Sequence, residues 1–322
     1  MSKERVCKFL EDSYQMNIIE KIKNFISGDD GIGDPPYEYD FLLNLDESEY
    51  EKYLRKIYKV RMGHSLNLKN PKTFSEKVQF LKLYDSSPLK RQLTDKIAVR
   101  DYVKEKIGEE YLKPLLQVCN AFDEIDFEKM PDAFVMKCSH GRGWQQVIKN
   151  KEKYLEAKPL IDITRRKMTE WLDQEFWPWD GFELQYKGIN PKIMLEPLFR
   201  ENINLPGREI EVYCFSGEPE IIMNAVFNGE PEFCFYDKNF EYTDLILHPE
   251  GPRFIRQVPA DDLIKQAAEL SRKLSEGLKL ARIDWIEYQG KLYFGEFEFT
   301  PYSGLLNFNP KQDEKLGSLI KL

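Results

Sequence analysis

The chain has 322 residues, a formal net charge of −8, a hydrophobic fraction of 42% and a charged fraction of 32%. This composition is typical of a globular protein with a large core, and the length favours two or three subdomains. We find no apolar run of the ~20 residues that a membrane span needs, no apolar signal sequence and no cluster of Lys and Arg that would indicate a nucleic-acid partner. The five cysteines are scattered without a CxxC pair, which predicts neither a zinc site nor a disulfide framework and fits a cytoplasmic protein.

The first third of the chain is predicted to be helical. Apolar residues at helical spacing predict a short amphipathic helix at 13–28, followed by an exposed linker at 29–40 that is rich in Gly and Pro. This helix is expected to pack on the main domain, and binding to a membrane surface is the alternative. Further helices are predicted at 47–58, at 74–84 with Thr73 or Ser75 as its cap, and at 89–107.

From residue 134 onward the pattern changes to short strands and two helices. Strands are predicted at 134–137, 146–148, 193–199, 209–215, 218–227, 232–237, 280–288 and 291–299, and helices at 158–175 and 261–276. Gln289 and Gly290 form a tight turn between the last two strands. Without a regular β-α-β alternation, this order predicts an α+β fold with antiparallel sheets. No GxGxxG or GxxxxGK[ST] motif supports a dinucleotide-binding or P-loop domain.

The last predicted hairpin carries three carboxylates. Glu296 and Glu298 are two residues apart, so they point to the same face, and the turn places Asp284 opposite them. Phe297 and Phe299 alternate with the two glutamates, which predicts one buried face and one acidic face. Carboxylates gathered in this way repel one another unless a cation lies among them, and their oxygens suit Mg²⁺. Exposure of one or more of them to solvent is the alternative.

Other polar residues lie in positions that suit phosphate binding. Arg282 shares the acidic face, where it can contact a phosphoryl group or form an ion pair with a glutamate. Lys137 ends an apolar strand, and the loop after it contains Gly141 and Gly143, whose backbone N–H groups can approach phosphate oxygens. This loop can equally be an ordinary turn, and His140 within it can be a base, a ligand or a structural residue.

Two further sites are suggested by charge within helical and apolar segments. Lys96 and Arg100 are one turn apart on the predicted helix at 89–107, and the sequence alone favours a solvated helix face as their explanation. Glu196 lies inside an apolar strand and is followed by Pro197, which removes one donor from the sheet. Such a break can expose backbone groups to an adenine edge, or it can mark the end of an edge strand.

These segments, in this order, resemble the ATP-grasp superfamily, and most closely its TupA-like branch, named for teichuronopeptide biosynthesis. The resemblance runs from about residue 50 to the end and is strongest over 66–112, 134–143, 213–219 and 293–304. It implies that ATP lies between two α+β subdomains. The implied division is an N-terminal helix and linker at 1–45, a helical region at 46–130, a lid subdomain with the glycine loop at 131–200 and a metal-binding subdomain at 201–322.

The resemblance also implies roles for individual residues. Lys96 would be the first nucleotide lysine, and Lys137 the second, touching the adenine and the α-phosphate. The remaining nucleotide contacts would come from the glycine loop over the phosphates (Gly141, Arg142, Gly143) and from the adenine hinge (Glu196, Leu198). Mg²⁺ and the γ-phosphate would be held by Arg282, Asp284, Glu296 and Glu298, with Arg282 and Lys137 as the catalytic residues. Contacts to the substrate would come from Arg100, His140, Ser303 and Gly304.

Three residues depart from the pattern of this branch. Glu298 stands where Thr is usual, Arg142 stands where Ser is usual in the glycine loop, and Glu211 stands where we would expect Lys. Glu298 would still be able to ligate a metal. Arg142 would contact the γ-phosphate or an acidic substrate. A missing lysine at 211 would weaken the contacts to phosphate.

The function that the resemblance implies is that of an ADP-forming ligase dependent on Mg-ATP. A carboxylate would be activated as an acyl phosphate and then attacked by an amine to give an amide. The expected acid is a uronic acid of a bacterial capsule or other surface polysaccharide, and the amine an amino acid or amino sugar. The alternatives are a phosphotransferase on the same fold, a non-catalytic module that binds nucleotide or glycan, and, with less support, a glycosyltransferase.

Overall fold

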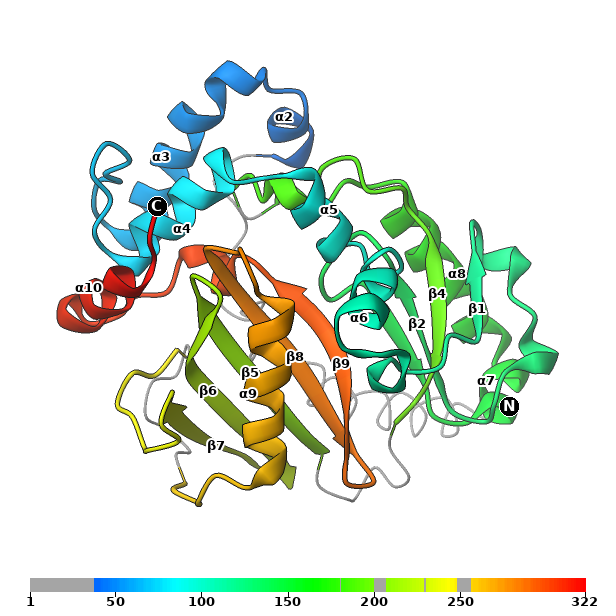
Figure 1. Cartoon of the computed structure of the whole chain (residues 1–322). Helices are drawn as coiled ribbons and strands as arrows, with labels where there is room; N and C mark the ends of the chain where they lie inside the picture. Colours follow the sequence, from blue (N-terminus) through cyan, green and yellow to red (C-terminus); the bar gives the residue numbers. More distant parts are fainter. Residues whose placement is uncertain (1–37, 180, 200–206, 229, 248–255) are drawn as a thin grey trace.

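The computed structural model describes residues 38–179, 181–199, 207–228, 230–247 and 256–322 (Figure 1). The helix predicted at 13–28 and most of the linker at 29–40 lie outside these residues. The α-helices are α2 (Tyr39–Leu43), α3 (Tyr50–Met62), α4 (Phe74–Tyr84), α5 (Pro88–Thr94), α6 (Val99–Ile107), α7 (Lys151–Glu156), α8 (Lys158–Leu172), α9 (Asp262–Leu274) and α10 (Pro310–Leu319). No helix in the described part of the chain is long and apolar enough to span a membrane.

The strands form two antiparallel sheets. The smaller sheet has the order β1-β4-β2-β3 and the larger the order β7-β6-β5-β8-β9. Their strands are β1 (Gln117–Cys119), β2 (Phe134–Cys138), β3 (Gln145–Ile148), β4 (Ile193–Pro197), β5 (Gly207–Phe215), β6 (Glu218–Asn228), β7 (Glu230–Asp237), β8 (Leu280–Tyr288) and β9 (Lys291–Glu298). The α+β fold with antiparallel sheets that the sequence predicts is therefore confirmed.

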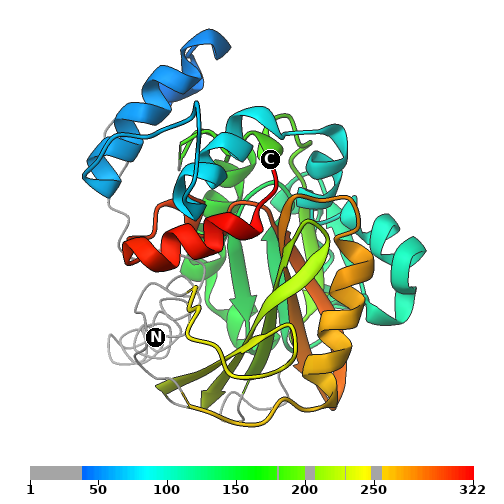
Figure 2. The same ribbon diagram turned by 60° about the vertical axis from the view of Figure 1, so that its left-hand side comes forward.

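Helices cover one whole face of the larger sheet and part of the other. Side chains of α6 and α9 pack with Val212, Ile283 and Trp285 on the first face. Side chains of α4 and α10 pack with Tyr213 and Leu280 on the second. Figures 1 and 2 show α9 and α10 on opposite sides of this sheet. The part of the second face that α4 and α10 leave uncovered carries polar residues of β5, β8 and β9.

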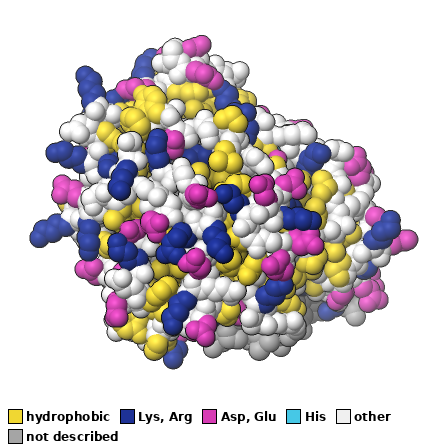
Figure 3. Space-filling view, in the orientation of Figure 1, with side chains coloured by type: hydrophobic (Ala, Val, Ile, Leu, Met, Phe, Trp, Pro, Cys, Tyr) yellow, Lys and Arg dark blue, Asp and Glu magenta, His cyan; other side chains and the backbone are white. Residues whose placement is uncertain are grey.

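The smaller sheet also has one face that packs against helices and one face that they leave uncovered. Phe134 and Met136 of β2 and Leu195 of β4 point into a core with Tyr154 of α7 and Met168 of α8. The alternate residues of these strands point the other way, because successive side chains in a strand leave opposite faces. On the outer surface, acidic and basic side chains are intermixed, as Figure 3 shows for the face seen in Figure 1.

Several boundaries agree closely with the sequence predictions. The helix predicted at 74–84 is α4, and its start is fixed by a capping box in which the Thr73 side chain accepts from the N–H of Glu76 and Glu76 binds back to the cap. The last two strands also lie where they are predicted, joined at Gln289 and Gly290, which both have positive φ. Strand β1 and helices α2, α7 and α10 have no counterpart among the predicted elements.

The single helix predicted at 89–107 is wrong. The chain forms two helices, α5 and α6, because Asp95 adopts an extended conformation and its side chain accepts from the N–H groups of Ile97 and Ala98. The N–H of Lys96 donates to the carbonyl of Ser139 at 3.1 Å. Lys96 therefore lies in the turn between the helices, not one helical turn before Arg100.

Candidate active site

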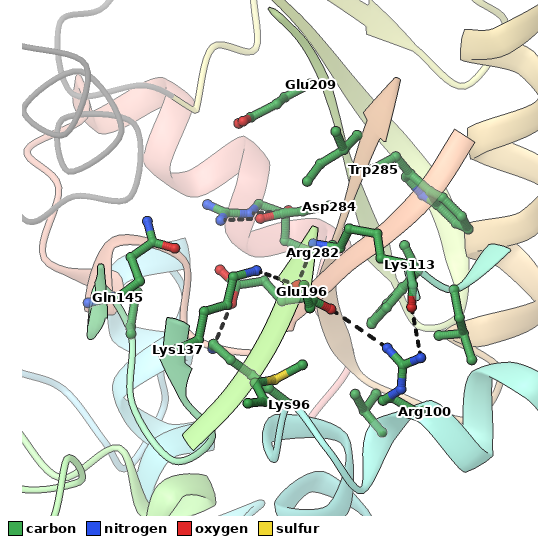
Figure 4. A pocket seen from close by; sticks show the side chains of 18 of the residues that line it. Lys96, Arg100, Lys113, Lys137, Gln145, Glu196, Glu209, Arg282, Asp284 and Trp285 are labelled. Atoms are coloured by element: carbon green, nitrogen blue, oxygen red, sulfur yellow. Dashed lines mark hydrogen bonds and ion pairs between the residues drawn. The ribbon is translucent and has the colours of Figure 1, made fainter. Parts of the chain in front are cut away.

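The uncovered faces of the two sheets line a polar cleft, which Figure 4 shows from close by. The turn between α5 and α6 and the segment after α6 complete its wall. The charged residues that line it are Lys96, Arg100, Lys113, Lys137, Arg142, Glu196, Glu209, Glu211, Arg282, Asp284 and Glu296. Its apolar lining includes Val99, Leu112, Met194 and Ile286. A cleft with apolar walls and more cationic than anionic side chains at one end suits a nucleotide.

Glu196 is the centre of a cationic cluster in this cleft. Its carboxylate accepts from Lys137 at 2.9 Å and Lys113 at 3.1 Å, and Arg100 lies 3.6 Å away (Figure 4). Burial by itself would raise the pKa of Glu196, but Lys137 and Lys113 outweigh it and lower the pKa to about 2. Three cations share one carboxylate, so the cluster keeps a positive charge that can attract phosphate.

Lys113 is a residue of this cluster that the sequence analysis missed. Burial lowers its pKa to about 8. It follows the short turn after α6 and sits between Leu112 and Pro114, outside any motif. A lysine between apolar residues is a weak signal in the sequence, because lysine stems often cover apolar surface while the ammonium reaches water.

The β8–β9 hairpin presents its carboxylates through a β-bulge. Ile283 pairs with Phe297 and Trp285 with Phe294, so Gly295 and Glu296 together lie opposite Asp284. The extra residue keeps both phenylalanines in the core and turns Glu296 into the cleft. The prediction of one apolar and one acidic face is confirmed, although the bulge that produces it was not foreseen.

Arg282 and Asp284 form a two-pronged ion pair on the floor of the cleft. Nε and Nη2 of Arg282 donate to the two carboxylate oxygens of Asp284, both at 2.8 Å. Nε also lies 3.6 Å from a carboxylate oxygen of Glu211, which is opposite Asp284 on β5 and accepts from the Tyr213 hydroxyl at 2.7 Å. Nη1 of Arg282 is buried and has no hydrogen-bond partner among the described residues.

The other two glutamates of the hairpin have separate partners. Lys96 donates to Glu296 at 2.8 Å and, after the opposing effect of burial, lowers the pKa of Glu296 to about 2. Glu298 is almost fully buried and pairs with Arg142 of the glycine loop at 3.0 Å. Of the two, only Glu296 lines the cleft.

The remaining candidates lie outside the lining of the cleft. Nε2 of His140 lies 3.0 Å from the carbonyl of Trp171 and 3.1 Å from that of Gln174, so the ring joins its loop to the end of α8. The Leu198 N–H donates to the carbonyl of Ala133. Ser303 donates to the buried Glu183, and the carbonyl of Gly304 accepts from Gln79 at 3.0 Å. Gly141 also does not line the cleft, whereas Gly143 does.

The donors present fit Mg²⁺ in part. Among the described residues, no three His, Cys, Asp or Glu side chains gather closely enough to hold a metal ion. Mg²⁺ commonly takes only one or two protein carboxylates and completes its shell with water and substrate phosphate. Asp284 and Glu296 have that chemistry and line the cleft. The position of Glu298 does not favour it as a ligand.

Two sheets facing a cationic cleft, with carboxylates on a hairpin opposite, define an ATP-grasp protein. The family model described as TupA-like ATP-grasp matches residues 76–321, and the chain belongs to that family. No curated protein matches the sequence.

The solved structures that resemble this chain include D-alanine–D-alanine ligase from Bacillus anthracis with ATP, at 16% identity and a TM-score of 0.41, covering 71% of this chain and 63% of that one. They also include the ADP complex of purK, N5-carboxyaminoimidazole ribonucleotide synthetase, at 10% identity and a TM-score of 0.41, covering 79% and 57%. A third is the ATP-grasp ligase PsnB with its minimal precursor, at 13% identity and a TM-score of 0.36, covering 73% and 62%. The chain thus spans less than two thirds of each of these proteins.

Proposed function

We propose that this protein is an ATP-dependent ligase that joins a carboxylate to an amine and releases ADP and phosphate. The observation that carries the proposal is the charge arrangement of the cleft. Lys137, Lys113 and Arg100 gather around Glu196 at one end. At the other end, Arg282 keeps an N–H group that has no partner among the described residues. An unused buried donor and a surplus of cations are the features that a bound polyphosphate would satisfy. Membership of the TupA-like ATP-grasp family supports the same assignment.

Each group in the cleft has a role in this proposal. Lys96 and Lys137 bind the phosphates of ATP, and Glu196, which lines the cleft, marks the segment of β4 that lies along the adenine. The Nη1 group of Arg282 binds the phosphoryl group in transfer, where charge builds up. Asp284 and Glu296 would hold Mg²⁺, which neutralises charge on the phosphate oxygens when it is bound. We also propose the boundary near residue 200 between the two parts that enclose the nucleotide.

The reaction needs little acid–base chemistry from side chains. A carboxylate oxygen of the acid attacks the γ-phosphorus of ATP, the bond to the bridging oxygen breaks, and ADP leaves. The amine nitrogen then attacks the acyl carbon of the resulting acyl phosphate, loses a proton, and phosphate leaves. Positioning and neutralisation of charge account for most of the catalysis of such a transfer.

The proposed acid is a uronic acid, free or carried on a nucleotide or glycan, and the proposed amine is an amino acid or amino sugar. The product would belong to a bacterial capsule or cell-surface polysaccharide. This follows from the resemblance to the teichuronopeptide-type branch. The reaction would take place in the cytoplasm, where ATP is available.

The test is ADP release from Mg-ATP against a matrix of uronates and amines, with mass spectrometry of each mixture. We expect ADP only with a matching pair, together with a product lighter than their sum by one water. ADP release in the absence of any amine, with a stable phosphorylated acid, would instead identify a phosphotransferase. If uronates never stimulate ADP release while another acid does, the polysaccharide assignment is wrong.

A non-catalytic binding module is the second candidate, and one observation favours it. Asp284 and Glu296, the proposed metal ligands, are each already paired with a cation of the protein at 2.8 Å. Nucleotide binding without any ADP formation, across the whole substrate matrix, would support this role. Turnover with any acid and amine would exclude it.

A further inference from the structure

A buried ion pair joins the glycine loop to the opposite side of the cleft. Arg142 lies in the loop between β2 and β3 of the smaller sheet, and Glu298 is the last residue of β9 in the larger sheet. Nη1 of Arg142 donates to Glu298 at 3.0 Å, and the two side chains are 3% and 2% exposed. The pair therefore links the two sheets where they meet, shielded from solvent and from the screening that weakens surface pairs.

Glu298 is held in place by further contacts. Its second oxygen accepts from the N–H of Thr300 at 2.9 Å and from the Thr300 hydroxyl at 3.1 Å, and that hydroxyl accepts from Gln185 at 3.0 Å. Both carboxylate oxygens of Glu298 therefore accept from neighbouring donors.

The loop that carries Arg142 is buried over residues 139–142 and exposed at Gly143. The Arg142 guanidinium lies 5.8 Å from the centre of the Phe176 ring. Gly141 lies so close to the Trp144 ring that an added Cβ would come within 2.4 Å of it. The N–H of Ser139 donates to the carbonyl of Lys192 at 2.8 Å. These contacts hold the first half of the loop against its neighbours.

We propose that Arg142 and Glu298 are positioning residues that hold the glycine loop as a fixed wall of the nucleotide site before any nucleotide binds. Breaking one partner of a buried pair leaves an uncompensated charge, which is strongly unfavourable, so the pair resists opening of the loop. A wall that is already in place removes the ordering cost that binding would otherwise include. The identity of the ligand rests on the proposed function, whereas the fixing of the loop does not.

The test measures amide hydrogen exchange of residues 139–145 and of α9 in the full chain without nucleotide. The variants are Glu298→Gln and Arg142→Met, with Arg142→Lys as the conservative change. The matched control is Arg165→Gln, which removes an exposed pair with Asp123. Direct titration with Mg-ATP gives the Kd of each protein.

In the wild type we expect slow exchange at Ser139 and Gln145, whose N–H groups donate to the carbonyls of Lys192 and Gly143. Glu298→Gln and Arg142→Met should raise exchange in the loop at least tenfold, leave α9 unchanged and weaken Mg-ATP binding at least tenfold. For Arg142→Lys we expect loop exchange rates and a Kd within about threefold of the wild-type values. For Arg165→Gln we expect the wild-type exchange rates and Kd. The proposal is overturned if the wild-type loop exchanges at the rate of an unprotected segment, or if the loop loosens while the Kd is unchanged. Absence of Mg-ATP binding by the wild type would contradict the proposed function, and the exchange data alone would then decide whether the loop is fixed.

Discussion

At the residue scale, the lowered pKa of Glu196 predicts how the free energy of unfolding changes with pH. Its pKa falls from an ordinary 4.5 to about 2 because two lysines face it. A carboxylate with a lowered pKa adds stability above its unfolded pKa and loses it as the pH falls through 4.5 toward 2. We expect Glu196→Gln to remove this dependence, so the difference in free energy of unfolding between the wild type and the variant should shrink by about 2 kcal/mol from pH 7 to pH 3.

Denaturant unfolding at a series of pH values measures this difference. Glu276→Gln is the control, because Glu276 is exposed in a surface pair with Lys106. Its difference from the wild type should stay nearly constant over the same range. If the difference in free energy of unfolding between the wild type and Glu196→Gln is also the same at pH 7 and pH 3, the cations do not stabilise the carboxylate.

The sequence was informative for residues whose position follows from strand alternation. Lys137, Arg282 and Asp284 line the cleft, since a period of two determines the face of a strand. Glu296 lines it as well, but through the bulge in β9. The pairing of Arg142 with Glu298 was not foreseen. These residues are 156 positions apart, and only the folded chain brings them together. Two of the three departures from the branch pattern, Arg142 and Glu298, are thus partners of each other.

At the element scale, the β8–β9 hairpin is predicted to carry the chemistry. Asp284→Asn and Glu296→Gln should reduce ADP formation at least 100-fold while the fold is kept, because each change removes a negative charge from the proposed metal site. The measurement is ADP release with a productive acid and amine, together with a melting curve. Glu287→Gln on the same hairpin is the control, since Glu287 accepts from the Gly290 N–H in the turn and is not among the residues that line the cleft. Full activity in both site variants would contradict the metal assignment.

The bulge in this hairpin depends on Gly295. An added Cβ would lie 2.8 Å from the carbonyl oxygen of Asp284, closer than non-bonded atoms normally approach. We expect Gly295→Ala to destabilise the protein by about 2 kcal/mol and to lower activity by displacing Asp284 and Glu296. Gly290→Asn in the turn is the control, because Asn tolerates positive φ and no atom of the described residues lies within 4 Å of a Cβ there. If the two variants unfold at the same temperature, the bulge is not constrained by its glycine.

The break between α5 and α6 is a helix boundary that the sequence pattern does not predict. The apolar positions at 89–107 fit one helix, and no Gly or Pro interrupts them. Asp95 ends α5 by capping the next turn with its own side chain, and the backbone N–H of Lys96 donates to the carbonyl of Ser139 in the loop after β2. The second interaction is tertiary, so local propensity cannot predict it. It is also the contact that places Lys96 against Glu296.

At the scale of the whole molecule, the sequence predicted most strands but not their order. Strand β4 pairs with both β1 and β2, and β8 lies between β5 and β9, so neighbours in the sheets are often distant in the chain. The position of the cleft depends on this order, because its lining comes from both sheets and from α6. A ligand in the cleft would contact elements from both halves of the molecule at once.

This arrangement predicts that nucleotide binding stabilises the whole fold. A ligand that binds only the native state adds about 2.7 kcal/mol at a concentration of 100 times its Kd, which corresponds to a rise in melting temperature of roughly 5 °C or more. We expect a non-hydrolysable ATP analogue with Mg²⁺ to raise the Tm by this amount in one cooperative transition, and the analogue without Mg²⁺ to raise it less. Lys137→Met should lose most of the shift, because it removes a cation that lines the cleft, whereas Lys106→Met on the outer face of α6 should keep it. A Tm that does not respond to millimolar Mg-nucleotide, or that responds equally in Lys137→Met, would show that the cleft between the sheets is not the nucleotide site.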